Sequence, residues 1–137
     1  MYQASIEMSW AKWNREALEL CTLFTLRCTK QAMEKATAGG DPILLPTICI
    51  VEATYLVEKN RIQTEALARL EHAVGIPDSF VQPVALTAEI VVALKKISRN
   101  SVPNMPDRII AATALALALP LVTRDGKIRA SGIETIW

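Results

Sequence analysis

The strongest constraint on the fold is an apolar segment with an aspartate at each end. Residues 109–122 are almost entirely apolar, and Asp107 precedes them while Asp125 follows. Pro106 suits the first turn of a helix and Pro120 cannot continue one, so the segment predicts a helix and then a short buried strand. Because the chain crosses the domain and returns, we expect both aspartates to lie at the same edge of a sheet.

The rest of the chain repeats this alternation of helices and short apolar strands. Periodic apolar positions, caps and breakers predict helices over residues 6–24, 29–38, 48–62, 64–75, 88–98, 107–118 and 127–131. Strands are predicted over residues 41–47, 80–86, 119–123 and 133–137. Short buried strands between helices indicate an α/β fold, with a mostly parallel sheet covered on both faces.

Several local features refine this prediction. Thr47 and Thr87 are expected to cap the helices that follow them, and Pro83 predicts an edge strand because it cannot donate a ladder hydrogen bond. In the predicted helix over residues 88–98, the apolar side chains Ile90, Val91, Leu94 and Ile97 are expected to face inward. Residues 20–26, LCTLFTL, remain open to a second interpretation as a strand.

Length and composition exclude several classes of protein. The 137 residues fit one domain, and a net charge of +1 argues against nucleic-acid binding by overall attraction. Three cysteines without metal-ligand spacing indicate a reducing compartment, so we expect a cytoplasmic protein. The apolar run over residues 109–122 is shorter than the roughly 20 residues of a membrane-spanning helix, so no membrane association is expected.

Glu52 is an acid on an apolar helical face. Its helical neighbours are Ile48, Cys49, Tyr55 and Leu56, none of which carries a charge. Either this carboxylate reaches solvent at the rim, or it needs a cation, hydrogen bonds or a raised pKa, since burying a lone charge is costly.

Asp107 and Asp125 each have a structural explanation as well as a functional one. Asp107 can interact with a helix dipole, and Asp125 can serve the turn before Gly126. Asp125 also follows a strand, where open parallel sheets bind ligands. If both aspartates meet Glu52 at one edge, their repulsion calls for a hard cation such as Mg or Mn, which can promote phosphodiester hydrolysis.

Other chemistries have little support. His72 is the single histidine and lies among charged residues, which weighs against serine-histidine and zinc-histidine mechanisms, and no glycine-rich phosphate loop is present. Arg124, Lys127 and Arg129 either hold phosphates beside Asp125 or form an ordinary solvated turn.

Three motifs then point to a family. The segments LLPTICIVEATYLVEKNRI, MPDRIIAATALALALPLVTRD and KIRASGIETIW, in this order, resemble PIN domains, and in particular the VapC-type ribonuclease toxins of toxin-antitoxin pairs. The resemblance covers residues 30–137 of a single PIN-like domain, whereas residues 1–28 are atypical.

The resemblance carries expectations about fold and site. It implies a three-layer α/β/α sandwich and an endoribonuclease that requires Mg or Mn. It also implies an RNA substrate, a cognate antitoxin and a homodimer. By motif, Glu52, Asp107 and Asp125 match the metal-binding catalytic acids and Thr123 matches the accompanying hydroxyl residue, while Asn104 stands where many relatives carry an aspartate.

The N-terminus departs from the family pattern. PIN domains begin with a strand that ends in an aspartate, and residues 1–28 contain only Glu7, Glu16 and Glu19 as acids, none in the matching context. The first strand is therefore expected to be missing or replaced, either by residues 20–26 or by a helix packed on an incomplete sheet. A shifted reading frame is a third explanation. The absent acid leaves two functions open, an active ribonuclease or an impaired homologue that binds antitoxin or RNA without cleavage.

Overall fold

A computed structural model describes residues 2–4, 34–36, 38–123 and 125–136. Its helices are α3 (Thr47–Glu58), α4 (Thr64–Gly75), α5 (Ala88–Leu94), α6 (Met105–Leu117) and α7 (Gly126–Ala130). Its strands are β1 (Tyr2–Ala4), β2 (Ile43–Pro46), β3 (Val81–Val84), β4 (Leu121–Val122) and β5 (Thr135–Ile136). The predicted helix over residues 6–24 and the alternative strand over residues 20–26 lie outside the described residues.

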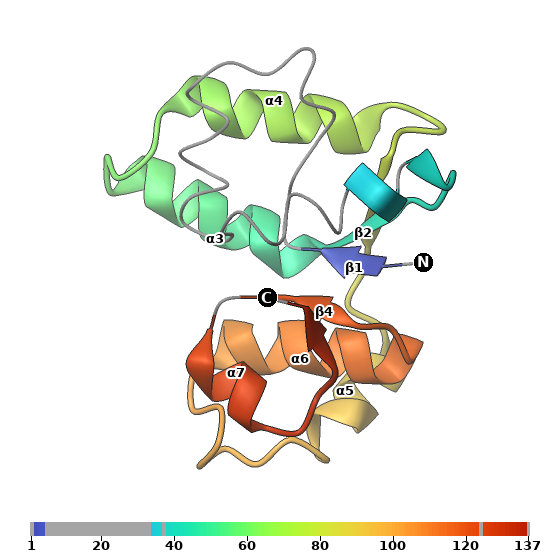
Figure 1. Ribbon diagram of the computed structural model, residues 1–137. Helices are drawn as coiled ribbons and strands as arrows, with labels where there is room; N and C mark the ends of the chain where they lie inside the picture. Colours follow the sequence, from blue (N-terminus) through green and yellow to red (C-terminus); the bar gives the residue numbers. More distant parts are fainter. Residues whose placement is uncertain (1, 5–33, 37, 124, 137) are drawn as a thin grey trace.

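The five strands form one parallel sheet in the order β3-β2-β1-β4-β5. Figure 1 shows α3 and α4 on one side of this sheet and α5, α6 and α7 on the other. The predicted three-layer α/β fold is therefore confirmed. Pro83 lies in β3 at the edge of the sheet, as its missing amide hydrogen requires.

The central position of the sheet is filled by β1, which the sequence pattern did not predict. Gln3 lies opposite Leu44 of β2 on one side and opposite Leu121 of β4 on the other. The centre of the sheet is thus filled by three residues at the start of the chain, and the predicted replacement by residues 20–26 falls outside the described residues. Without Tyr2–Ala4, the facing backbone groups of β2 and β4 would lack hydrogen-bond partners.

Burial of the sheet and its helices follows from the apolar runs. Ile43, Leu45, Leu121 and Val122 are fully buried, as expected for strands covered on both faces. Helix α6 buries six consecutive residues, from Ile109 to Ala114, and the buried hydroxyl of Thr113 donates to the carbonyl oxygen of Ile109 at 2.7 Å. The buried polar group on this helix is therefore satisfied within its own turn.

Several predicted helix boundaries are wrong; α3, for example, ends at Glu58 rather than at residue 62. Thr47 is the first residue of α3 rather than its cap; Pro46 occupies the cap position with an extended backbone, so β2 leads into α3 without a loop. Helix α5 ends at Leu94, and the next three amides bond to carbonyls three residues earlier. Thr87 does occupy the cap position of α5, although its side chain makes no capping hydrogen bond.

The inward face predicted for α5 is correct only in part. Ile90 and Ile97 are buried and Leu94 is partly buried, whereas Val91 is 49% exposed.

Arg108 of α6 explains the early end of α5, since its Nη2 donates to the carbonyl oxygens of Leu94 at 3.2 Å and Ile97 at 3.0 Å. These long-range bonds satisfy carbonyl groups that another helical turn would have used.

The central position of β1 predicts a strong effect of proline there. Gln3→Pro removes an amide hydrogen inside the sheet and leaves a facing group unpaired, so we expect the free energy of unfolding to fall by roughly 1–3 kcal/mol or more. Gln3→Ala retains the amide and serves as the control. Chemical denaturation of both variants measures the difference; equal stability would contradict the pairing of β1 with β2 and β4.

Candidate active site

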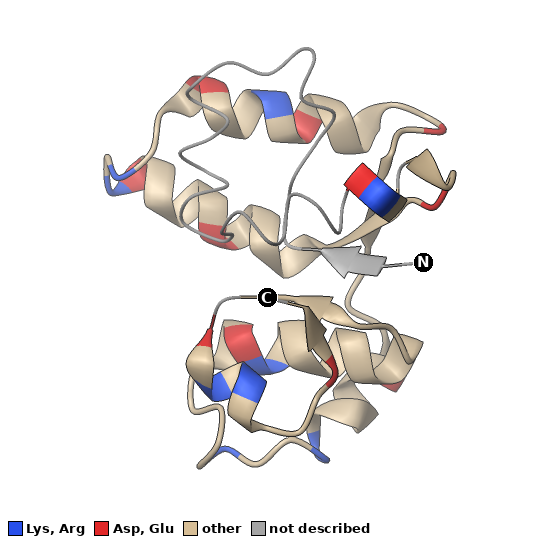
Figure 2. Ribbon diagram, in the orientation of Figure 1, with Lys and Arg blue, Asp and Glu red and all other residues tan. Residues whose placement is uncertain are grey.

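Three acids predicted from the sequence lie on elements that begin at the carboxyl edge of the sheet. Glu52 belongs to α3, which follows β2; Asp107 lies in the first turn of α6; and Asp125 precedes α7, after β4. Figure 2 shows Asp or Glu positions on α3 and at the start of α6, with Lys and Arg positions on α7. This edge is where parallel sheets generally bind ligands.

Electrostatic interactions show that these acids are neighbours. The pKa of Glu52 is raised, first by its burial and then by the negative charge of Asp107. The pKa of Asp107 is also raised, chiefly by burial and further by Asp125, while its hydrogen bond with Asn104 and the charge of Lys127 act in the opposite direction. Asp107 is therefore the central member of the group, influenced by charges on both sides.

Asn104 and Asp107 are brought together by the start of α6. Asn104 occupies the cap position of this helix, but its side chain makes no capping bond. Instead its Nδ2 donates to Oδ2 of Asp107 at 3.0 Å. The bond fixes the orientation of the Asp107 carboxylate, so Asn104 supports this acid.

Asp125 is held by the backbone of α7. Its Oδ1 accepts hydrogen bonds from the amides of Lys127 at 2.8 Å and Ile128 at 2.9 Å, which makes it the N-cap of the helix. The buried Thr123 side chain accepts from the Asp125 amide at 3.1 Å. Because the cap uses Oδ1 alone, it leaves Oδ2 available for another role.

The structure describes two of the three basic residues that the sequence predicts beside Asp125. Lys127 and Arg129 lie in α7. The positive charge of Lys127 lowers the pKa of Asp107, which indicates that Lys127 lies near the acids. Arg124 lies outside the described residues.

The side chains at this site that could bind a divalent metal ion are carboxylates. Among the residues that the structure describes, no group of three or more His, Cys, Asp or Glu side chains is close enough to hold a metal ion. Mg, however, is usually held by one or two carboxylates and retains several waters. Glu52 and Asp107 are two partly buried carboxylates, and the charge of Asp107 raises the pKa of Glu52, so they fit that chemistry as a pair.

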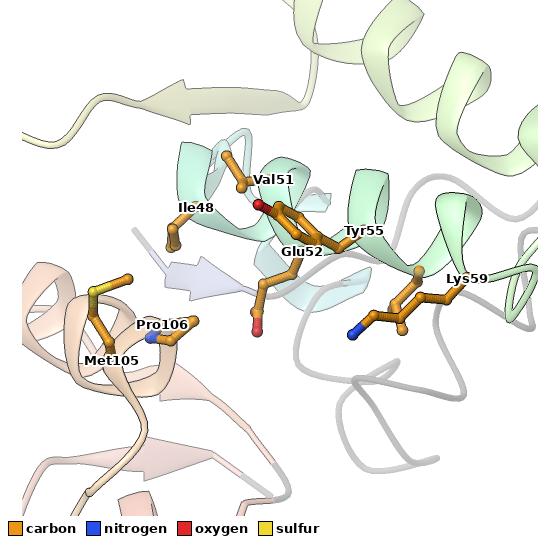
Figure 3. A pocket seen from close by; sticks show the side chains of 8 residues that line it. Ile48, Val51, Glu52, Tyr55, Lys59, Met105 and Pro106 are labelled. Atoms are coloured by element: carbon orange, nitrogen blue, oxygen red, sulfur yellow. The ribbon is translucent and has the colours of Figure 1, made fainter.

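Sequence reasoning missed a pocket beside Glu52. It has a volume of about 390 Å³; α3 contributes Ile48, Val51, Glu52, Tyr55 and Leu56, the residue after α3 contributes Lys59, and α6 contributes Met105 and Pro106. Figure 3 shows these side chains around the opening between the two helices. The spacing of Glu52, Tyr55, Leu56 and Lys59 along one helical face was a signal for it.

Arg108 is a second residue that was missed. Besides the two bonds to α5, its Nε is buried and has no hydrogen-bond partner among the described residues. The guanidinium connects the first turn of α6 to the end of α5, and so holds the adjacent Asp107 in place.

The two roles of Asp125 can be separated by substitution. Asp125→Ala removes the cap and is expected to lower the free energy of unfolding by about 1 kcal/mol, whereas Asp125→Asn retains a capping oxygen and should stay near the wild-type value. Chemical denaturation of both variants provides the measurement. If Asn were as destabilising as Ala, the charge of Asp125 rather than its capping bonds would stabilise the fold.

The raised pKa of Glu52 predicts a pH-dependent stability. A carboxyl whose pKa is higher in the folded state favours folding at low pH, and this contribution is lost as the pH rises through the folded-state pKa. In the presence of a chelator, Glu52→Gln should therefore be more stable than the wild type at pH 7. The difference should disappear below the ordinary glutamate pKa of 4.5.

The control for this measurement is Glu58→Gln, at the exposed end of the same helix. We expect this variant to match the stability of the wild type at pH 7 in the same chelator. A loss of stability in Glu52→Gln at pH 7 would show that Glu52 makes a favourable interaction in the metal-free protein, contrary to its desolvated environment.

Comparison with known proteins identifies the family. No curated protein matches the sequence. The model of the PIN domain matches residues 25–132, a range that contains Glu52, Asp107 and Asp125 and extends from before β2 to beyond α7. PIN domains are generally nucleases that depend on a divalent metal ion, which agrees with an acidic site at the carboxyl edge of the sheet. The match confirms the family indicated by the sequence motifs, and the chain belongs to the PIN domain family.

Proposed function

We propose that this protein is a Mg- or Mn-dependent endoribonuclease of the VapC toxin type, which hydrolyses RNA phosphodiesters. The observation that carries the proposal is the pair of partly buried acids, Glu52 and Asp107, whose pKa values are both raised at the carboxyl edge of a PIN domain. Acids that repel one another in a partly desolvated site favour binding of a cation.

Each acid has a distinct part in this proposal. Asp107, held by Asn104 and flanked by the other two acids, is the central metal ligand, and Glu52 is the second. Asp125 uses Oδ1 to cap α7, so Oδ2 is the oxygen that would face the metal or one of its waters. A bound Mg or Mn ion would activate water and stabilise negative charge at the phosphate.

The chain's own residues would also position the RNA. Lys127 and Arg129 on α7, together with Arg124, are the proposed phosphate contacts, since cations are needed to offset the acids as the backbone approaches. Thr123 fixes the start of α7 through the Asp125 amide, and so maintains the position of the acid relative to these basic side chains.

The proposal includes a cognate antitoxin, a homodimer and a cytoplasmic location. Exposed apolar side chains on and near α5 support a protein interface, because their burial by another protein is energetically favourable. They are Leu86, Val91 and Val92. None of the helices in the described parts of the chain has the length and apolar character to cross a membrane.

A second candidate is an impaired PIN homologue that binds RNA or antitoxin without cleavage. It is favoured by the composition of β1, since Tyr2–Ala4 fills the central strand without contributing an acid at its end. Because fewer carboxylates hold a metal ion less firmly, such a protein could bind RNA or antitoxin and yet lack the metal ion needed for cleavage.

The proposal is tested by incubating single-stranded RNA with the purified protein in EDTA and then with excess Mg or Mn. We expect cleavage only with the metal, and a loss of more than about 100-fold in Asp107→Asn, because even changes beyond the ligand shell cost 10- to 100-fold. Asp125→Asn should also reduce the rate. Glu65→Gln, an exposed acid in α4, is the control and should cleave normally.

Two outcomes would contradict the proposal. Cleavage that survives both Asp107→Asn and Asp125→Asn would identify a contaminating nuclease. RNA binding without cleavage in either metal would favour the impaired homologue.

A further inference from the structure

The pocket between α3 and the first turn of α6 shares a wall with the acidic site. Glu52 lines the pocket and also interacts electrostatically with Asp107. Most of the remaining lining is apolar, and its volume of about 390 Å³ is at the lower end of the range for small-molecule sites. The pocket is therefore of a size to hold one compact group beside the acids, rather than a long segment of a protein partner.

We propose that this pocket binds a single unstacked nucleobase of single-stranded RNA, with Tyr55 as the stacking surface and Lys59 as the contact for a neighbouring phosphate. The inference rests on the proposed function, because it identifies the base that would lie beside the cleaved phosphodiester.

The exposure of the lining side chains supports a flat, apolar occupant. Tyr55 is 57% exposed, and Val51 and Met105 are also exposed large apolar residues. Figure 3 shows Tyr55 and Val51 on α3, with Met105 and Pro106 on the facing turn of α6. Aromatic side chains bind single-stranded nucleic acids by stacking on the bases, and this contact tolerates different sequences because every base has a flat face.

The charges at the pocket fit the two parts of a nucleotide. Lys59 follows Tyr55 by one helical turn, and Figure 3 shows that Lys59 and Glu52 extend to the same side of α3. The carboxylate of Glu52 would repel a phosphate, whereas the ammonium group of Lys59 would attract it. A neutral base in the apolar middle of the pocket, with its phosphate toward Lys59, is the arrangement that avoids the unfavourable contact.

The test measures binding of a short, unstructured, fluorescently labelled single-stranded RNA to the 137-residue chain in EDTA, where the RNA stays intact. Tyr55→Leu should weaken binding by about 5- to 150-fold, the range that corresponds to loss of one stacked base. Tyr55→Phe keeps the ring and should bind nearly as the wild type does. Leucine suits an exposed helical position, so the variant is expected to fold.

Phe80→Leu is the matched control, because Phe80 is 53% exposed and lies outside the pocket. The same RNA is also prepared with an abasic ribose at each position in turn. One abasic position should weaken binding to the wild type as strongly as Tyr55→Leu does, and should cause no further loss in that variant. This non-additivity connects the missing base to the Tyr55 ring.

A second pair of variants tests the phosphate contact. The plot of log affinity against log salt concentration has a negative slope. In Lys59→Gln this slope should become less steep by about 0.7, the value for one phosphate contact on a single strand. Lys95→Gln is the control; Lys95 follows α5 as Lys59 follows α3, but is not part of the pocket. An unchanged slope in Lys59→Gln would remove Lys59 from the proposal.

The remaining outcomes separate this inference from the proposed function. Metal-dependent cleavage with no effect of Tyr55→Leu on RNA binding would overturn the base pocket alone. Base-dependent binding that requires Tyr55, without cleavage, would support the pocket and contradict the nuclease. If Tyr55→Leu leaves RNA binding unchanged but disrupts self-association in sedimentation, the occupant is a second copy of the chain and the inference is wrong.

Discussion

Hydrogen bonding on both sides of β1 is the interaction on which the arrangement of this molecule depends. β1 pairs with β2 on one side and with β4 on the other, so it joins the two halves of the sheet. Glu52 follows β2, and Asp125 follows β4. A three-residue strand therefore sets the spacing of the elements that carry the candidate active site.

Ionisation of the acids at the candidate active site destabilises the folded state. Glu52 and Asp107 are partly buried, and each has a raised pKa, so their ionised forms disfavour the folded state. The hydrogen bond from Asn104 to Asp107 acts against the rise in the Asp107 pKa and so offsets part of this cost. Unfavourable electrostatics of this kind are common where function requires charged groups to approach one another, and a bound cation would reduce the repulsion.

Much of the fold could be predicted from the sequence because its strands are continuous apolar runs between helices. The strands at Ile43–Pro46 and Leu121–Val122, and the edge position of Pro83, follow from composition and from proline chemistry. The proximity of Asp107 to both other acids was likewise predictable from parallel topology, which directs strand ends to one edge.

Features that depend on tertiary contacts were not predictable. Tyr2–Ala4 is too short to produce a period-2 pattern, and its strand character comes from its two neighbours. The end of α5 depends on hydrogen bonds from Arg108, more than ten residues away in the chain. The place of Lys59 in a pocket becomes visible only when α3 and α6 are seen together.

The most direct test of the account is a calorimetric titration of the metal-free protein with Mn at neutral pH. If Asp107 and Glu52 hold a divalent cation, the wild type should bind Mn, and Asp107→Asn should weaken binding by about tenfold or more, with Glu52→Gln also reducing it. Binding that is unchanged in both variants would show that these acids are not the metal site, and would contradict the central claim.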